Sequence, residues 1–253
     1  MSRSFSSIRE SVTHESATRE PSGHEPATPT ILRAVGLSKQ VRSGSRTLTV
    51  IDALDLDVAP GDCLAILGRS GAGKSTLLSL LAGLDQPSGG ELYLFDTALS
   101  RADEDGRAKL RAGQVGFVFQ NFQLLPTLTA LENVMLPLEL TEARDKSARA
   151  KTWLERVGLS DRLDHLPRQL SGGEQQRVAI ARAFVTEPKL VFADEPTGNL
   201  DQHTGQSVAE LLFSLNRDQG TTLIVVTHDT ELARQCARQL TLADGALIPW
   251  ENL

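Results

Sequence analysis

The chain has little of what marks membrane, secreted or nucleic-acid-binding proteins. No apolar run approaches the ~18 residues of a transmembrane helix, and the longest runs, CLAILG, KLVFAD and TTLIVVT, have the length of strands. Only two cysteines occur in 253 residues, Cys63 and Cys236, each beside an apolar run. We therefore expect small core residues in a reducing cytosol. There is no run of basic residues and the formal net charge is -6, so nucleic acid is not an expected partner.

The first 30 residues have few large apolar side chains and are rich in Ser, Thr, Glu and Pro. They lack the apolar core of a signal peptide, and such a composition does not bury enough surface to fold. The sequence therefore predicts a disordered tail over residues 1–30 and a folded domain over 31–253. Because no membrane segment is expected, a role at a membrane has to come through a partner.

From Ile31 onward, strand-like segments alternate with helical ones, which predicts an α/β fold with a mainly parallel sheet. CLAILG is apolar throughout, as in a strand buried on both faces. LTVIDALDLDV alternates and predicts a half-buried antiparallel strand, and QLTLADGALI predicts a hairpin around Asp-Gly. The other expected strands are GGELYLFD, VGFVFQ, KLVFAD and TTLIVVT. Helices are expected over about 74–83 and 172–185, and from about residues 204 and 230. Only helical segments are expected over about 127–170, which indicates a helical insertion.

The segment GRSGAGKS, between an apolar strand and a helix, fits a phosphate-binding loop. Its glycines allow backbone amides to surround phosphate oxygens. Lys74 is expected to reach the β- and γ-phosphates, Ser75 to bind Mg²⁺, and Thr76 to lie near the α-phosphate. A glycine-rich turn with a surface lysine is the simpler alternative, and the flanking strand and helix disfavour it. The expected phosphate-binding residues are Gly68, Arg69, Ser70, Gly71, Ala72, Gly73, Lys74, Ser75 and Thr76.

Polar residues follow three further apolar strands. Asp194 and Glu195 end one strand, where charged groups are costly unless they have a role. We expect Asp194 to bind Mg²⁺, directly or through water, and Glu195 to act as general base. Gln120 follows VGFVF and could contact Mg²⁺ or the attacking water, and His228 follows TTLIVVT and could contact the γ-phosphate. Alone, each is more often an ordinary polar residue, but the carboxyl edge of a parallel sheet is where such folds bind ligands. The other histidines, His14, His24, His165 and His203, show no metal-ligand spacing.

The segment LSGGEQQ opens a second helix with glycines. Ser171 and Glu174 predict a capping box, but this does not explain Gly172 and Gly173, because glycine weakens a helix. Bare backbone at a helix N-terminus lets a phosphate approach the amides. The γ-phosphate at the chain's own site is already expected to be surrounded by Lys74, Mg²⁺, Gln120 and His228. We therefore expect Ser171, Gly172 and Gly173 to contact the nucleotide of a second copy.

The order of these motifs resembles the ATPase subunits of ABC transporters over about residues 31–248. GRSGAGKST resembles the Walker A motif, LVFADE the Walker B motif, and LSGGEQQ the signature; GNLD resembles the D-loop, Gln120 the Q-loop residue and His228 the H-loop residue. The resemblance implies a P-loop (RecA-like) fold, in which a mainly parallel sheet carries an antiparallel β subdomain and an inserted helical subdomain. It also implies ATP and Mg²⁺ as ligands, hydrolysis of ATP, and a head-to-tail homodimer. In that dimer each signature helix covers the ATP bound by the other copy.

VGFVFQNFQLLPTLTALENVMLPL and FADEPTGNLD are most similar to the macrolide-export and lipoprotein-release (MacB/LolD-like) branch, and within it to YbbA-type members. This implies a permease partner with few membrane helices and a large extracytoplasmic domain, and a cargo that is hydrophobic or lipid-linked. The subunit would then lie at the cytoplasmic face of the inner membrane, held by the permease. An ATPase that regulates an envelope enzyme or a cell-division complex is the alternative. A soluble ABC protein acting on DNA or ribosomes fits poorly, because the chain has neither a second cassette nor a long coiled coil.

Two further expectations concern ligands and partners. The family usually places an aromatic residue that stacks on adenine where this chain has Val41 and Arg42, so GTP is expected to compete with ATP better than usual. Large apolar residues near Gln120 would be exposed unless a partner covers them, which predicts a permease contact there. These residues are Phe122, Leu124, Leu125 and Leu128.

Overall fold

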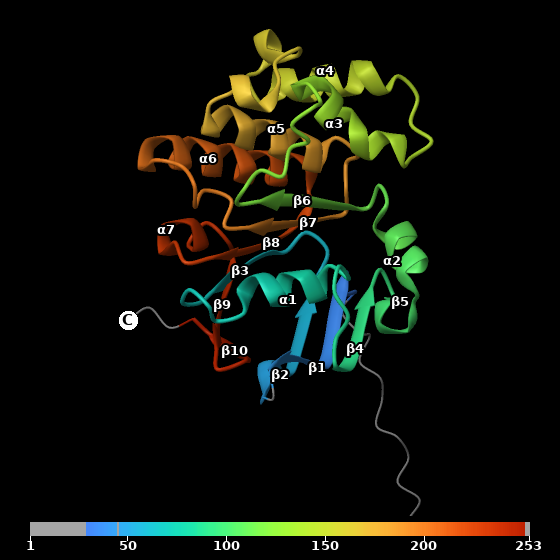
Figure 1. Ribbon diagram of the computed structural model, residues 1–253, viewed down its shortest axis with the longest axis vertical. Coiled ribbons are helices and arrows are strands. Elements are labelled where there is room, and N and C mark those ends of the chain that lie inside the picture. The colour runs from blue at the N-terminus through green and yellow to red at the C-terminus, as the bar shows by residue number, and fades with distance from the viewer. Residues whose placement is uncertain (1–28, 45, 251–253) are drawn as a thin grey trace, which may run out of the picture.

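The computed structural model describes residues 29–44 and 46–250, and the tail expected over residues 1–30 lies almost entirely outside them. The described chain forms two sheets (Figure 1). The smaller sheet has the order β2 (Arg46–Val58), β1 (Leu32–Ser43), β4 (Gly89–Leu94), β5 (Thr97–Ala98). The larger has the order β10 (Ala246–Pro249), β9 (Arg238–Ala243), β3 (Cys63–Leu67), β8 (Thr222–Thr227), β7 (Leu190–Asp194), β6 (Val115–Phe119).

The larger sheet confirms the expected mainly parallel arrangement. Strands β9, β3, β8, β7 and β6 pair in parallel, and β10 turns back on β9. The turn between β9 and β10 is Asp244–Gly245, both with positive φ, which is what a two-residue hairpin turn needs. The carboxyl ends of β3, β6, β7 and β8 therefore lie at one edge of the sheet.

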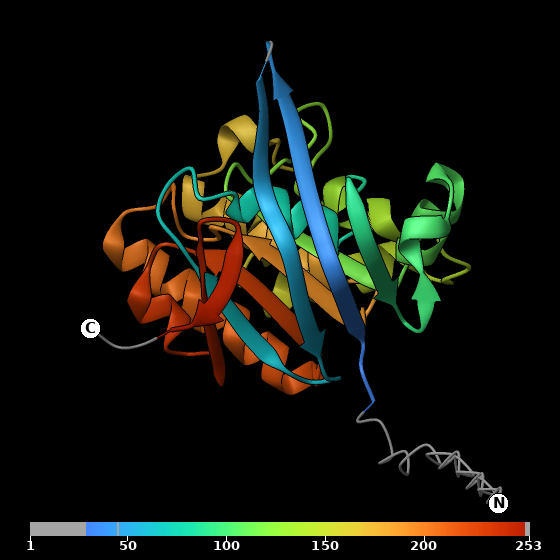
Figure 2. The ribbon, with the colours of Figure 1, turned by 90° about the horizontal axis from the view of Figure 1, so that it is seen from below.

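The helices cover the larger sheet from both sides (Figure 1). Helix α1 lies between the two sheets, while α3 to α6 lie on the opposite face, and the smaller sheet lies across the bottom of the molecule (Figure 2). The helices are α1 (Lys74–Leu81), α2 (Glu104–Arg111), α3 (Ala130–Glu139), α4 (Lys146–Arg156), α5 (Gly172–Phe184), α6 (Gln202–Gln219) and α7 (Thr230–Ala233). Three short 3-10 helices span Leu99–Arg101, Ser160–Arg162 and Pro167–Gln169.

Strand β3 shows why its segment is apolar throughout. Leu64 and Ile66 enter the core formed with α1 and the smaller sheet, while Ala65 and Leu67 enter the core formed with α3 to α6. A strand buried on both faces positions the loop that follows it tightly. The two cores thus fix the start of the phosphate loop.

The helical character expected over about 127–170 is present. In the part of the chain described, this stretch holds α3, α4 and two 3-10 helices and no strand. Trp153 of α4 stacks on Phe184 of α5, with ring centroids 6.0 Å apart. The division of the chain into a main domain and a helical subdomain stays a prediction.

Three local features differ from the sequence-based expectations. Helix α2 was not expected, because its residues are mostly charged; Asp103 caps it, and Arg107 is buried in it. Helix α6 begins at Gln202, two residues before the expected start at about Thr204, because the Asp201 carboxylate caps it by accepting a hydrogen bond from the Thr204 amide. The alternation in β2 breaks at Ala53, whose φ is positive.

Candidate nucleotide-binding and catalytic site

The phosphate loop connects β3 to α1. Gly71 and Gly73 have φ of 80° and 95°, and a Cβ at Gly73 would lie 2.8 Å from Val50 Cγ1. Positive φ and the close approach of a neighbouring side chain both favour glycine. Gly73 is also the N-cap of α1, and among the described residues no side chain caps this helix. Its first-turn amides are therefore available to bind an anion, as the motif requires.

A cavity of about 1210 Å³ surrounds this loop. It is larger than the ~300–1,000 Å³ of common ligand sites, so a nucleotide fits. The lining comprises residues 48–50 of β2, 67–72, His228, 241–245 and Trp250. Among these described lining residues, none comes from α5.

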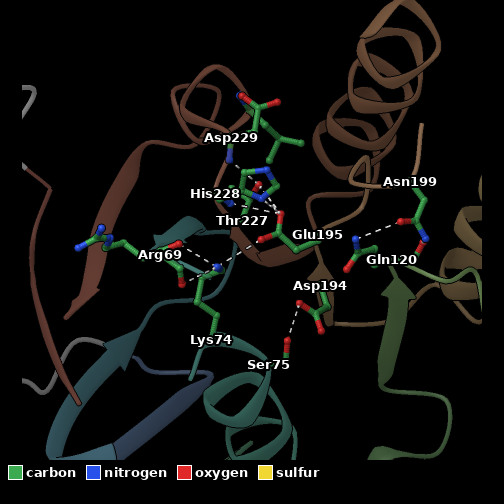
Figure 3. Close-up of polar contacts among 12 residues, drawn as sticks. Arg69, Lys74, Ser75, Gln120, Asp194, Glu195, Asn199, Thr227, His228 and Asp229 are labelled. Atoms are coloured by element: carbon green, nitrogen blue, oxygen red, sulfur yellow. Dashed lines mark hydrogen bonds and ion pairs between the residues drawn. The ribbon is translucent and has the colours of Figure 1, made fainter. Parts of the chain in front are cut away.

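Lys74 lies at the centre of the loop (Figure 3). Its side chain is 8% exposed, and Nζ donates hydrogen bonds to the carbonyls of Gly68 at 2.8 Å and Arg69 at 3.4 Å. Nζ also lies 3.3 Å from Glu195 Oε1. The ammonium group of Lys74 thus lies beside the end of β7, where it could bind a phosphate.

Ser75 and Asp194 meet across the site. Ser75 Oγ donates a hydrogen bond to Asp194 Oδ1 at 3.2 Å. Burial, together with the nearby Glu195 carboxylate, raises the pKa of Asp194, although the hydrogen bond from Ser75 opposes this. A bound cation would relieve both penalties. Hydroxyl and carboxylate oxygens are the donors that Mg²⁺ prefers, so this pair fits the ion.

Glu195 adopts a positive φ of 44°, which is uncommon for a residue with a side chain and is concentrated at functional sites. Its Oε2 accepts hydrogen bonds from Thr227 Oγ1 at 3.0 Å and the His228 amide at 3.2 Å, and lies 2.9 Å from His228 Nδ1. Burial alone would raise the pKa of Glu195, but the hydrogen bonds from His228 and Thr227 outweigh it and lower the pKa. The carboxylate is therefore ionised at neutral pH, as a base must be.

Gln120 lies on the opposite side of Asp194 from Lys74 (Figure 3). It follows Phe119, which pairs with Asp194 in the sheet. Its Nε2 donates to Asn199 Oδ1 at 3.1 Å, and Asn199 Nδ2 donates to the Gln120 carbonyl at 3.0 Å. The structure thus connects Gln120 to the GNLD segment, a link that the sequence alone did not indicate.

The signature segment opens α5 as a capping box. Ser171 Oγ accepts from the Glu174 amide at 3.3 Å, and Glu174 Oε2 accepts from the Ser171 amide at 2.8 Å. A Cβ at Gly173 would overlap the methyl group of Thr204 in α6, whereas one at Gly172 would lie 3.3 Å from Leu200. Gly173 therefore has a packing reason that sequence analysis did not find. Gly172 is the more accessible of the two.

Comparison with known proteins now decides the family. The chain matches the ABC transporter family over residues 51–198, more than half of its length. The chain belongs to the ABC transporter family. It is 57% identical over 213 residues to the uncharacterized ABC transporter ATP-binding protein YbbA of Escherichia coli, covering 83% of this chain and 93% of that protein. It is 50% identical over 226 residues to the lipoprotein-releasing system ATP-binding protein LolD of Hydrogenovibrio crunogenus, covering 88% and 98%.

Solved structures of ABC cassettes confirm the fold. A dimeric, post-hydrolysis state of the ATP-binding cassette MJ0796 bound to ADP and Pi superposes with a TM-score of 0.80, at 37% identity, covering 88% of this chain and 100% of that one. CbiO1 from Clostridium perfringens, part of the transporter complex cbiONQ, gives 0.75 at 28% identity, covering 87% of each. The chain is thus an ATPase subunit of an ABC transporter, a class that dimerises and works with membrane permeases. Within the described residues, no helix is long and apolar enough to cross a membrane.

Three residues of this ABC ATPase site have no sequence pattern that indicates their contacts. Thr227 Oγ1 donates to Glu195 Oε2 and accepts from the Asp229 amide at 3.0 Å. Asn199 bonds instead to Gln120. Thr227 ends an apolar strand and is typical of any buried strand, so nothing in its pattern indicates where its hydroxyl points.

Proposed function

We propose that the chain is the ATP-hydrolysing subunit of a homodimer that drives a permease with a large extracytoplasmic domain. The permease would hold it at the cytoplasmic face of the inner membrane, and the cargo would be hydrophobic or lipid-linked. The relatives support this: LolD is named for a lipoprotein-releasing system and shares 50% identity. The observation that carries the catalytic part is the convergence of Lys74, Ser75, Asp194 and Glu195 at one sheet edge.

In this proposal the loop amides and Lys74 bind the ATP phosphates. Ser75, Asp194 and Gln120 would hold Mg²⁺, which supplies charge neutralisation at the β- and γ-phosphates. Glu195 orients the attacking water and accepts its proton, since its hydrogen bonds keep it anionic. His228 would contact the γ-phosphate. Its Nδ1 lies beside Glu195 Oε2, and its imidazole lines the cavity.

The geometry supports a nucleotide shared between two copies. Ser171 is exposed, and the described lining of the phosphate-loop cavity includes no residue of α5. An anion site on the signature helix is therefore directed outward, toward a partner. The related cassette MJ0796 is dimeric, which supports the pairing of two copies.

An apolar groove supports the permease contact. It has a volume of about 520 Å³ and runs between α2, β6, α3 and the end of α5. Phe117, Phe119 and Leu136 line it, and Leu140 is 74% exposed at its rim. Of the four apolar residues expected near Gln120, Leu125 is exposed, at 47%, and the other three are half-buried. We propose that a short amphipathic cytosolic helix of the permease docks in this groove and over Leu125.

Copurification of the chain with its permease from membranes tests the proposal. Leu140→Glu and Leu125→Glu should each reduce the recovered complex at least about tenfold, since a charge in an apolar contact costs more than 1.4 kcal/mol. The matched control is Ile248→Glu, which is 48% exposed on β10, at the sheet edge opposite β6. If both groove variants copurify like the control, the permease docks elsewhere. Extraction of a lipid-linked substrate by the reconstituted complex, rather than ATPase activity alone, separates a transporter from a regulator.

A further inference from the structure

The chain's two cysteines lie at the amino-terminal edge of the large sheet, at the other end of β3 from the phosphate loop. Cys63 is the first residue of β3, the strand that carries the phosphate loop. Cys236 lies between α7 and β9, downstream of His228. Both belong to the same face of the large sheet: Cys236 is a buried member of the core formed with α3 to α6, and Cys63 packs against that core.

The backbone fixes this proximity independently of the thiols. Strands β3 and β9 are parallel neighbours, and Leu64 pairs with Arg238. This register continues with Cys63 opposite Ala237, so Cys236 is adjacent in the chain to the residue that faces Cys63. Because neighbouring strands lie about 4.8 Å apart, the two cysteines lie close to the ~4.4–6.8 Å Cα separation that a disulfide spans. Arg238 Nη1 lies 3.3 Å from the carboxylate of Asp62, next to Cys63. The side-chain amide of Gln239 donates to the Cys236 carbonyl. Both ends of the pair are therefore held in place.

We propose that Cys63 and Cys236 form a reversible intrachain disulfide by exchange with a low-molecular-weight disulfide such as oxidised glutathione. The Cys63 thiolate attacks one glutathione sulfur, and a glutathione thiolate leaves and takes up a proton. The Cys236 thiol then loses its proton and attacks Cys63 Sγ, which displaces the second glutathione. In sum, two protein thiols are oxidised, one S–S bond forms in the protein, and one oxidised glutathione becomes two reduced molecules.

The difference in exposure between the two thiols and the raised pKa of Cys236 explain why Cys63 reacts before Cys236. Cys63 is partly exposed, whereas Cys236 is 2% exposed. A hydrogen bond with the Cys63 thiol, together with burial, raises the pKa of Cys236. Since the thiolate is the nucleophile, the accessible Cys63 reacts first and Cys236 resolves the mixed disulfide.

The bond would join the start of β3, whose other end leads into the phosphate loop, to the segment between α7 and β9 that follows His228. It closes a loop longer than 100 residues, the range in which a cross-link restricts the unfolded chain most. With the typical effect of a disulfide on a chain of this size, the melting temperature should rise by about 5–15 °C on oxidation.

The experiment treats the purified, reduced full chain with oxidised glutathione, blocks remaining thiols by alkylation, and maps non-reduced peptides by mass spectrometry. We expect a cross-linked peptide pair, an intact mass lower by two hydrogen atoms, the higher melting temperature, and reversal by dithiothreitol. Cys236→Ser should instead keep one glutathione on Cys63. Cys63→Ser should stay unmodified, because Cys236 is buried.

The double variant with serine at both positions is the control, and its melting temperature should not respond to the oxidant. If wild type carries a stable glutathione on Cys63 without a cross-link, or if both thiols remain free for alkylation, the proposal is wrong. The peptide map of wild type decides this even if a serine variant fails to fold.

Discussion

If the signature segment serves a nucleotide bound by the other copy, Ser171→Arg should abolish ATP hydrolysis while leaving ATP binding intact. The substitution removes the capping hydroxyl that accepts from the Glu174 amide, which costs about 1 kcal/mol. Helix α5 is held by many buried side chains, so the chain should still fold. Lys74 and the described cavity lining are untouched. The bulk of arginine at the helix mouth blocks the approach of a second nucleotide site.

Mixing tests this arrangement directly. A Ser171→Arg chain and a Lys74→Ala chain should each be inactive alone. A mixed dimer has one site with both defects and one with neither, and random pairing makes half of the dimers mixed. ATPase activity, measured as phosphate release, should therefore recover to on the order of a quarter of wild type if the two sites act independently.

The control places both substitutions in one chain and mixes it equally with wild type. If sites are shared, each site of a mixed dimer carries one defect, and about a quarter of wild-type activity remains, from wild-type dimers alone. If each chain formed its own site, mixed dimers would be half active and about half of the activity would remain. No recovery in the first mixture together with half activity in the second would refute a shared site.

Four further predictions follow from the site. Glu195→Gln should lower ATP turnover by about 10²–10⁴-fold and leave the ATP dissociation constant nearly unchanged, because the carboxamide keeps an acceptor for its neighbours but is not a base; near-normal phosphate release would contradict this. Thr227→Val removes a hydrogen bond that lowers the pKa of Glu195, so that pKa should rise and the acid limb of the pH–rate profile should move to higher pH; an unmoved limb would show that Thr227 does not tune the base. Val41, on β1 and 37% exposed, offers no ring for stacking, so GTP should compete well with ATP, and Val41→Tyr should tighten nucleotide binding by about tenfold or more in a fluorescence titration; unchanged affinity would place the base elsewhere. Gly173→Ala should lower the melting temperature, because its methyl group would overlap a side chain of α6, whereas Gly172→Ala should lower ATP turnover with little effect on melting; equal effects on melting would show that both glycines pack.

Much of this site could be predicted because its residues follow strands of a recognisable kind. Asp194, Glu195, Gln120 and His228 each come after an apolar run, and parallel strands bring their carboxyl ends to one edge. The structure brings Lys74 within 3.3 Å of Glu195 by this route. The order of the elements and the direction of the strands are enough to place these residues together, and a single sequence carries both.

The parts that were missed depend on contacts between distant segments. Asn199 is joined to Gln120 across 79 positions in the chain, and Thr227 reaches Glu195 across 32. Neither side chain has a pattern that indicates its partner, because both residue types are common at strand ends and turns. Helix α2 was missed for a different reason. Its stability comes from the Asp103 cap and from burial of Arg107, not from an apolar stripe.

The two glycines of the signature, Gly172 and Gly173, look alike in the sequence but have different physical roles in the structure. From the sequence, both weaken the start of α5 and both invite an anion. In the structure, Gly173 is buried and its missing side chain lets α5 approach Thr204 of α6, while Gly172 is more open and borders Leu200. Packing is therefore sufficient to explain Gly173, and anion binding is needed only for Gly172. Because α6 begins at the end of the GNLD segment that also holds Gln120 through Asn199, close packing at Gly173 fixes the signature helix relative to the Mg²⁺ side of the chain's own site. Helix α5, which we propose contacts the partner's nucleotide, is thus positioned by the GNLD segment, which borders the nucleotide site of the same chain.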